Sequence, residues 1–482
     1  MENRFVTDRS TQLWIVISVA FCSFMSRLNN YIVNISLPTI AENFHIGTGD
    51  VSRVVVVYLL IITSTLLLFG RLADKIGLKR IFIAGYSLFV FGSMLCGFSQ
   101  NIHVLVAFRC VQAIGSAMLL ASGYAIISKF LPQNITGWAF GITSTSSALG
   151  VATGAPLGGI ITAYLSWHWI FYINVPVGIL AIIVALKMIP KEDPAEAGSA
   201  AGGKSFDIPG AVLSFLGLLA LLYALNVGRK LGWTSPQVGL TFLVAAILFV
   251  LFIKREKTCK DPLLDLHFFT NMRFTLTIVA TFMAYILITG NAFLLPFYLE
   301  FVKGLNTKET GLVILTYSLI YVFCSSPAGK LADRVAPRIL CTIAMLSASL
   351  CAFTFAFTLP FHGLVPAFVF LIWLGFSYVL FFSPNNKQVM MFALEGKQGS
   401  ASGVFNTVMN LGMVFGVALF ETVFSLSLPP KAAGMEMSKV PPDLLLGGFQ
   451  NAYILGGLVC AIALMCSLLV RQQKIKPKIQ AF

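Results

Sequence analysis

The sequence predicts an all-α membrane protein with fourteen transmembrane helices. Of its 482 residues, 57% are hydrophobic and only 11% are charged, whereas a soluble protein carries roughly a quarter charged residues. Three long stretches contain no Asp, Glu, Lys or Arg, namely residues 130–186, 339–386 and 444–470. Because lipid offers the backbone no hydrogen bonds, unbroken apolar segments of this kind must cross the membrane as helices.

The individual spans follow from apolar runs of about 20 residues, the length needed to cross a hydrocarbon core of about 30 Å. The predicted helices are 13–37, 52–70, 80–99, 102–128, 136–163, 168–189, 208–227, 237–254, 274–302, 310–328, 339–359, 363–384, 401–425 and 450–470. An even number of spans places both chain ends on one side of the membrane.

The distribution of Lys and Arg predicts which side that is, because cytoplasmic loops are enriched in these residues. With both ends in the cytoplasm, 24 of the 33 Lys and Arg residues lie in cytoplasmic segments and seven in outer ones. The other two, Arg27 and Arg109, fall inside spans. We therefore expect a multi-pass protein of the cell inner (cytoplasmic) membrane with both termini cytoplasmic. Its net charge of +14 reflects this topology, and no nucleic-acid partner is expected.

A repeated loop divides the chain into two related halves. The segment Gly70-Arg71-Leu72-Ala73-Asp74-Lys75 recurs 259 residues later as Gly329-Lys330-Leu331-Ala332-Asp333-Arg334, on the same predicted side. Two predicted helices, 208–227 and 237–254, follow a polar linker and have no counterpart in the repeat. The expected organisation is an N-terminal six-helix bundle at 1–190, a linker with two inserted transmembrane helices at 191–269, and a C-terminal six-helix bundle at 270–482.

Four segments carry recognisable motifs. They are Gly70–Arg80, Arg109-xx-Gln112-xx-Gly115, Gly150-xxx-Gly154-Ala155-Pro156-Leu157-Gly158-Gly159, and Trp167-x-Trp169-Ile170-Phe171-x-Ile173-Asn174-x-Pro176-x-Gly178. Together they resemble the major facilitator superfamily and, within it, the fourteen-span drug:proton antiporter branch. The resemblance implies two six-helix bundles that rock around a midplane cavity, with two helices inserted between them. It also implies a secondary active exporter, not an enzyme, that needs no cofactor and no metal.

The first predicted helix departs from the family pattern at one position. It reads Leu28-Asn29-Asn30-Tyr31, where the family usually has an aspartate after the leucine that is implicated in proton coupling and cation recognition. Asn29 therefore favours export of an anionic or zwitterionic amphipathic molecule, with proton influx as the expected driving force. If Asn29 is an engineered replacement of aspartate, a cationic multidrug antiporter is expected instead. The sequence is also compatible with an uncoupled facilitator and with a lipid or siderophore exporter.

Polar residues inside the spans are the candidates for substrate binding or coupling, because a charge there is costly unless it faces a cavity or a partner. Arg27 lies near the midplane, either as a cavity cation that attracts an anionic group or as a structural residue that bonds between helices. Arg27, Asn30 and Asn34 share one helical stripe and Asn29 lies on another, so the sequence leaves open which stripe faces the cavity. The full set of candidates is Arg27, Asn29, Asn30, Asn34, Arg109, Gln112, Asn406, Asn410, Glu421 and Glu300.

Further candidates concern gating. By resemblance, the charged ends of the repeated loops would latch the inner gate, and the glycine-rich helix with its proline would bend between the halves. These residues are Arg71, Asp74, Lys75, Arg80, Asp333, Arg334, Gly154 and Pro156. An aromatic run comprises Trp373, Phe376, Tyr378, Phe381 and Phe382, and it predicts an aromatic cavity. Expected partners are a small-molecule substrate, protons and the lipid bilayer. A monomer is expected, and a periplasmic adaptor is left open.

Overall fold

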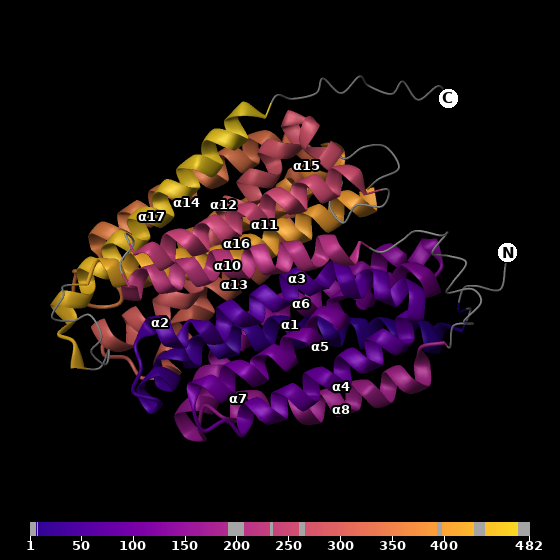
Figure 1. The fold of residues 1–482 in the computed structure, drawn as a ribbon, viewed down its shortest axis with the longest axis horizontal. Coiled ribbons are helices and arrows are strands. Elements are labelled where there is room, and N and C mark those ends of the chain that lie inside the picture. The colour runs from indigo at the N-terminus through magenta and orange to yellow at the C-terminus, as the bar shows by residue number, and fades with distance from the viewer. Residues whose placement is uncertain are drawn as a thin grey trace.

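The computed structural model describes residues 6, 8–190, 207–231, 235–259, 266–392, 398–428 and 439–470. Apart from short turns, this part of the chain is helical, and the long helices run side by side along the molecule (Figure 1). The helices are α1 Arg9–Asn43, α2 Thr48–Val51, α3 Arg53–Ile76, α4 Leu78–Gly97, α5 Ile102–Phe130, α6 Gln133–Tyr164, α7 Trp169–Tyr172, α8 Asn174–Met188, α10 Ile208–Leu231, α11 Pro236–Thr258, η2 Leu266–Thr270, α12 Met272–Phe297, η3 Tyr298–Val302, α13 Thr307–Arg334, α14 Pro337–Thr358, α15 Val365–Phe392, α16 Gln398–Leu426 and α17 Pro442–Leu469.

Each of the fourteen ranges predicted to be spans coincides with a helix or with two consecutive helices. By length and composition, twelve helices in the described part of the chain are apolar enough to cross a membrane. The helices α10 and α13 are not among the twelve. Only a shorter apolar stretch, Pro209–Leu221, was found in α10, and α13 carries polar residues at both ends. The total of fourteen spans therefore stays a prediction.

The repeat seen in the sequence is also present in the helix boundaries. α4 begins at Leu78 and α14 at Pro337, positions that are 259 residues apart. Different residues make the two turns. Gly77 has a φ of 110°, which favours glycine, whereas Pro337 has its φ fixed near the value of a first helical turn. The helix after the repeated loop thus begins at equivalent positions in the two halves, although different residues form the turn that precedes it.

The two halves lie side by side, with α1 to α8 on one side of the molecule and α12 to α17 on the other (Figure 1). α1 begins and α17 ends at the same end of the bundle, here named the termini end; the opposite one is the far end. The halves meet along three helix pairs, α1 with α12, α3 with α16, and α6 with α13. We call these contacts the seam.

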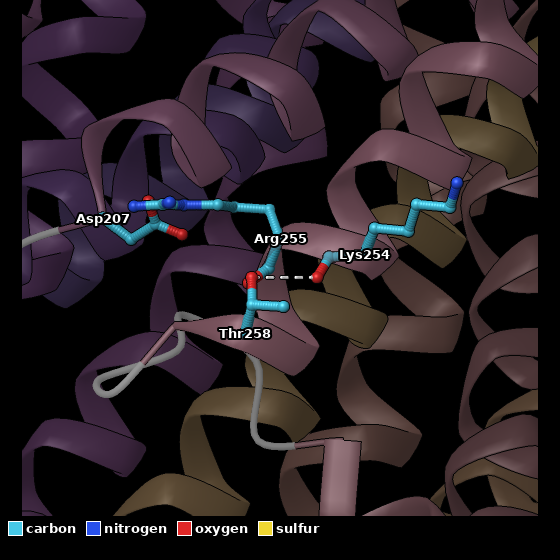
Figure 2. A network of polar contacts seen from close by, with 4 residues as sticks. All are labelled: Asp207, Lys254, Arg255 and Thr258. Atoms are coloured by element: carbon cyan, nitrogen blue, oxygen red, sulfur yellow. Dashed lines mark hydrogen bonds and ion pairs between the residues drawn. The ribbon is translucent and has the colours of Figure 1, made fainter.

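The hairpin of α10 and α11 lies against this seam, because α10 packs on both α3 and α16. An ion pair closes the hairpin at its termini end, where Arg255 Nε lies 2.9 Å from Asp207 Oδ1 and the Asp207 side chain is fully buried. Figure 2 shows Arg255 reaching to Asp207 while Lys254, its neighbour in the chain, points the other way. Because the Asp207 carboxylate is buried, loss of Arg255 would leave an uncompensated buried charge.

Candidate functional site

The position of α1 is set by its close contact with α6. A Cβ added at Gly150 would lie 2.5 Å from the Phe24 carbonyl oxygen, and one at Gly154 would lie 2.6 Å from Tyr31 Cβ. Only small residues on α6 allow the two backbones to approach so closely. This contact orients α1 so that Arg27 and its stripe face the space between the halves.

That space is a cavity of about 290 Å³ lined by helices of both halves. A second cavity of about 100 Å³ extends it toward the termini end, where Ser23 and Leu66 line the wall. Toward the far end only a small cavity of about 30 Å³ follows, lined by Ile35 and Leu295 among others. More accessible space therefore lies on the termini side of the central cavity than on its far side.

Arg27, Asn30 and Asn34 all line the central cavity. The Arg27 side chain makes no hydrogen bond or ion pair with another described residue, although it is close enough to Tyr31, Tyr285 and Tyr321 to interact electrostatically. Among the described residues, no aspartate or glutamate lines this cavity. Of the two polar stripes on α1, the one that contains Arg27, Asn30 and Asn34 therefore faces the cavity.

Asn29 lies on the other side of α1, inside the N-terminal half, and is fully buried. It ends a polar network that begins at Arg109, which is also fully buried. Arg109 Nη1 donates to Gln112 Oε1 at 2.6 Å, and Gln112 Nε2 donates to Ser93 Oγ at 2.6 Å and to Asn29 Oδ1 at 3.3 Å. The Arg109 guanidinium also stacks over the Tyr58 ring at 3.8 Å. Arg109 and Gln112 thus bind to each other and do not line the cavity.

The surroundings of Asn29 are rich in hydrogen-bond donors. Because arginine can only donate, Arg109 fixes the Gln112 amide with its NH₂ group toward Asn29. Asn174 Nδ2 also points at Asn29 Oδ1, at 3.5 Å. The Asn29 Nδ2 atom is buried and has no hydrogen-bond partner in the described part of the chain. A carboxylate would suit this pocket better than the amide that occupies it.

The remaining polar candidates lie on α16 and at the far end. Asn406 lines both the central cavity and its extension toward the termini end, and Asn410 lines the extension alone. Glu421 is 4% exposed and lines none of these three cavities, and its Oε1 accepts a hydrogen bond from Ser425 at 2.7 Å. Glu300 lies in the π-helical turn η3, which continues α12 at the far end of the seam.

The far end of the seam is closed by direct backbone contact between α6 and α13. A Cβ at Gly159 would lie 2.5 Å from the Thr307 carbonyl oxygen, and one at Gly311 would lie 2.6 Å from the Ala155 carbonyl oxygen. Thr307 also joins α13 to α1, with its hydroxyl 3.1 Å from that of Thr39. We call this group of contacts the far-end seal. Pro156 belongs to the seal, since its Cα would lie 3.3 Å from a Cβ at Gly311, and Gly154 lies on α6 just before it.

Thr307 connects the seal to Glu300, because its hydroxyl is within hydrogen-bonding reach of the Glu300 carboxylate. Glu42, at the end of α1, is close enough to Glu300 to interact electrostatically. Glu300 Oε1 is buried and has no hydrogen-bond partner among the described residues. Two carboxylates from opposite halves therefore lie within electrostatic reach of each other beside the closed seal.

The charged groups that follow Glu300 in the chain are engaged elsewhere. Lys303 donates to the carbonyl oxygen of Phe361, and burial lowers the pKa of its ammonium group. Lys308 donates to the Tyr164 hydroxyl at 2.8 Å, and Glu309 caps its own helix. From α17, the ring of Phe449 packs against η3. Each of these groups is thus engaged away from Glu300.

The gate candidates at the termini end are only partly described. Arg80 and Arg334 are exposed at helix ends. The side chains of the other four, Arg71, Asp74, Lys75 and Asp333, lie outside the described residues. The structure therefore leaves the proposed inner latch as a prediction.

Besides Tyr124 of α5, four tyrosines in the cavity wall went unnoticed in the sequence: Tyr31, Tyr285, Tyr317 and Tyr321. Of the aromatic run in α15, Phe382 alone lines the central cavity. Trp373 donates to Ser347, Tyr378 donates to the Ala284 carbonyl oxygen, and Phe376 is 45% exposed on the outside. The four tyrosines are spread over three helices, so only the register of those helices could have identified them.

Comparison with known proteins agrees with this architecture. The sequence profile of the Major Facilitator Superfamily matches residues 19–417. The chain belongs to this superfamily. The riboflavin transporter RibZ of Clostridioides difficile (strain 630) is 35% identical over 418 residues, which are 86% of this chain and 89% of that protein. The multidrug resistance protein Stp of Mycobacterium tuberculosis is 29% identical, over 86% of this chain and 76% of that protein.

Solved structures of superfamily members share the fold. The inward-open structure of the xylose transporter XylE from Escherichia coli covers 96% of this chain, and 98% of XylE is matched, with a TM-score of 0.66 at 12% identity. A bacterial homologue of the human lysosomal transporter Spinster, in an inward-facing and unoccupied conformation, also reaches 0.66 at 14% identity, over 97% of this chain and 100% of that one. The protein is thus a major facilitator transporter that acts on small molecules in a membrane, not an enzyme.

Proposed function

We propose that this major facilitator protein is a fourteen-span exporter that moves an anionic or zwitterionic amphipathic molecule out of the cytoplasm in exchange for protons. The observation that carries the proposal is Arg27, a cation in the cavity wall without a carboxylate partner among the described residues. A guanidinium in a low-dielectric cavity attracts an anionic group strongly and repels a cation.

The relatives support transport of organic molecules but do not share one substrate. One is a riboflavin transporter and another a multidrug resistance protein. A cationic multidrug substrate, the main alternative, receives little support from position 29. Because Asn29 is fully buried outside the cavity, even an aspartate there would not touch the substrate in this conformation. The expected charge of the substrate thus rests on Arg27 and no longer on Asn29.

Alternating access is supported by the unequal ends of the cavity. The cavity extends toward the termini end, while the far-end seal closes the other side. With both termini cytoplasmic, as the Lys and Arg distribution predicts, this conformation faces the cytoplasm. Export then requires the far-end seal between α6 and α13 to open.

Proton coupling is assigned in this proposal to Glu300. When the seal closes, burial of the Glu300 carboxylate disfavours its charged form, and Glu42 of the other half adds a smaller repulsion between like charges. A proton on Glu300 removes both penalties and lets Thr307 pack against the seal. Protons from the outer side thus favour closing toward the cytoplasm-facing state, and loss of the proton favours the outward-facing state. This order of events is that of an antiporter if the proton leaves Glu300 toward the cytoplasm while the seal is closed.

Glu421 is the second carboxylate that the sequence offered for coupling. It is buried within the C-terminal half, with Ser425 as a hydrogen-bond partner. Its location away from the cavities and the seal gives a proton on it no direct way to change either. We therefore propose Glu300 as the coupling residue in preference to Glu421.

Transport in liposomes tests the proposal. The purified protein is reconstituted, a proton gradient is imposed, and movement of labelled anionic and cationic amphiphiles is followed. We expect gradient-driven movement of anions, and a reduction of about tenfold or more in Arg27→Gln because a charge-assisted hydrogen bond is lost. The matched control is Lys254→Gln, which removes a positive charge from the exposed face of α11.

The Glu300 assignment has its own variant and control in the same assay. Glu300→Gln should still bind substrate but should move it equally well with and without a proton gradient. Glu309→Gln, nine residues along the chain, keeps its helix cap and should behave like the unaltered protein. Gradient-driven cation movement that is indifferent to Arg27→Gln would overturn the substrate charge. Anion movement that never depends on the gradient would identify an uncoupled facilitator.

A further inference from the structure

The two walls of the central cavity differ in chemistry. The C-terminal half contributes a continuous row of aromatic rings from α12, α15 and α13. Tyr285 lies 5.1 Å from Phe382, Phe382 lies 6.3 Å from Tyr321, and Tyr321 lies 6.4 Å from Tyr317, measured between ring centroids. A flat aromatic ligand gains more from such a wall than a saturated ligand of the same size, because ring quadrupoles favour offset or edge contacts.

The opposite wall, from α1 of the N-terminal half, is polar. Arg27 lines the central cavity and its extension toward the termini end. Asn34 lines the central cavity and the small cavity toward the far end. Seven residues of helix separate them by about 10 Å. The cationic group and the amide thus lie at the two ends of one wall.

Two buried polar atoms at the far-end side of the cavity have no hydrogen-bond partner among the described residues. They are the Tyr317 hydroxyl and the Asn34 side-chain oxygen, on residues that are 5% and 7% exposed. Leaving a buried polar atom unsatisfied costs free energy, which a ligand with matching groups would recover. A hydroxyl and an amide oxygen that line the same two cavities offer both a donor and an acceptor.

We propose that the substrate is a flat heteroaromatic anion, with its rings on the aromatic wall, its anionic group at Arg27, and a ring edge that carries both a donor and an acceptor at Asn34 and Tyr317. This inference rests on the proposed function in taking the cavity as the substrate site and Arg27 as the residue that binds the anionic group. The spacing along α1 fits two or three fused rings. The substrate would lie across the seam, with its charge on one half and its rings on the other.

Equilibrium binding to the purified protein in detergent tests this inference with three probes. The first, 2-oxo-1,2-dihydroquinoline-6-carboxylate, has flat rings, an amide edge and a carboxylate at the other end. The second, 2-naphthoate, lacks the amide edge, and the third is the decahydro form of the first probe, which is not flat. By titration calorimetry, we expect the first probe to bind about three- to tenfold more tightly than the third.

Variants separate the three parts of the site. Tyr321→Leu should abolish the preference for the flat probe over its saturated form, while Phe376→Leu, on the outer face of α15, should preserve it. Tyr317→Phe should weaken binding of the first probe, the quinolone, and leave binding of 2-naphthoate unchanged. Because the Tyr317 hydroxyl has no partner among the described residues, this variant loses no described hydrogen bond. Arg27→Gln should weaken all three probes about tenfold or more, and Arg27→Lys should restore part of the binding.

Equal binding of the flat and the saturated probe would overturn the inference. So would a preference that survives Tyr321→Leu, or equally tight binding of a quinolone probe in which a trimethylammonium group replaces the carboxylate. These outcomes differ from failure of the proposed function, because binding needs no gradient. A flat-ring preference without gradient-driven transport would contradict the antiport alone. Arg27-dependent transport without that preference would contradict only the substrate class.

Discussion

Arg27 and Asn29 are two positions apart on α1 and face entirely different surroundings. Arg27 lines the cavity between the halves, whereas Asn29 is enclosed in the N-terminal half with Gln112 and Asn174 as its hydrogen-bond donors. The substrate therefore meets the charge of Arg27 directly. Any influence of position 29 must pass through the network that ends at Arg109.

The donor-rich pocket around Asn29 predicts that a carboxylate is accepted there. In Asn29→Asp, the Gln112 and Asn174 amides, which now share one amide oxygen, would donate to a charged carboxylate. Gln112 would link that carboxylate to Arg109. We expect the free energy of unfolding to change by less than about 1 kcal/mol, because charge-assisted hydrogen bonds offset the burial of the charge. The midpoint of thermal unfolding, followed by tryptophan fluorescence, measures this.

Asn29→Leu is the matched comparison. It leaves the Gln112 and Asn174 amides with one partner fewer and should cost about 1–3 kcal/mol. If Asn29→Asp lowers the unfolding midpoint as much as Asn29→Leu does, the pocket is not suited to a carboxylate.

Among the helices, α6 contacts α1 of its own half through Gly150 and Gly154 and α13 of the other half through Gly159. The glycine motif in the sequence predicted a close approach to a neighbour. It could not say that one run of small residues serves two neighbours, since that depends on how α13 begins after η3. Gly159, which contacts the other half, is therefore a better position than Gly150 or Gly154 at which to alter the conformational equilibrium.

Gly159→Val is expected to weaken the far-end seal. Its added atoms would meet the Thr307 backbone, and overpacking of this kind costs about 1–3 kcal/mol. A penalty of that size changes the ratio of closed to open molecules by about 5- to 150-fold. Hydrogen exchange of the peptide that begins α13 should increase accordingly.

Gly141→Val is the control, because nothing lies within 4 Å of a Cβ at Gly141 on the same helix. Hydrogen exchange at α13 should stay unchanged in this variant. Equal exchange in both variants would mean that Gly159 does not hold the seal closed.

For the molecule as a whole, the apolar runs predicted the helices well, and the repeated loop predicted the relation between the halves. Both follow from local sequence, because each span must satisfy its own backbone in lipid. The cavity lining could be predicted less well from the sequence. Tyr285, Tyr317 and Phe382 come from three helices far apart in the chain, and the Arg27 stripe was chosen by packing against α6. Neither the rotation of a helix nor its partners are encoded in its hydropathy.

Membrane topology is testable with reporter fusions. A green fluorescent protein fused after residue 482 should fluoresce in the cytoplasm, and alkaline phosphatase fused there should be inactive. Phosphatase inserted between α10 and α11, at residues 232–234, should be active if these two helices cross the membrane. Inactive phosphatase at this site, together with a cytoplasmic C-terminus, would reduce the number of spans to twelve.

The placement of α10 has a consequence for compounds dissolved in the bilayer. The cavity lies between two lateral boundaries, one formed by α3 and α16 and the other by α6 and α13. Of the helices described, α10 is packed across the first boundary and no helix covers the second in the same way. A lipid-dissolved molecule would therefore meet two different lateral faces of the transporter, one covered by α10 and one where the packing of α6 on α13 alone separates the bilayer from the cavity.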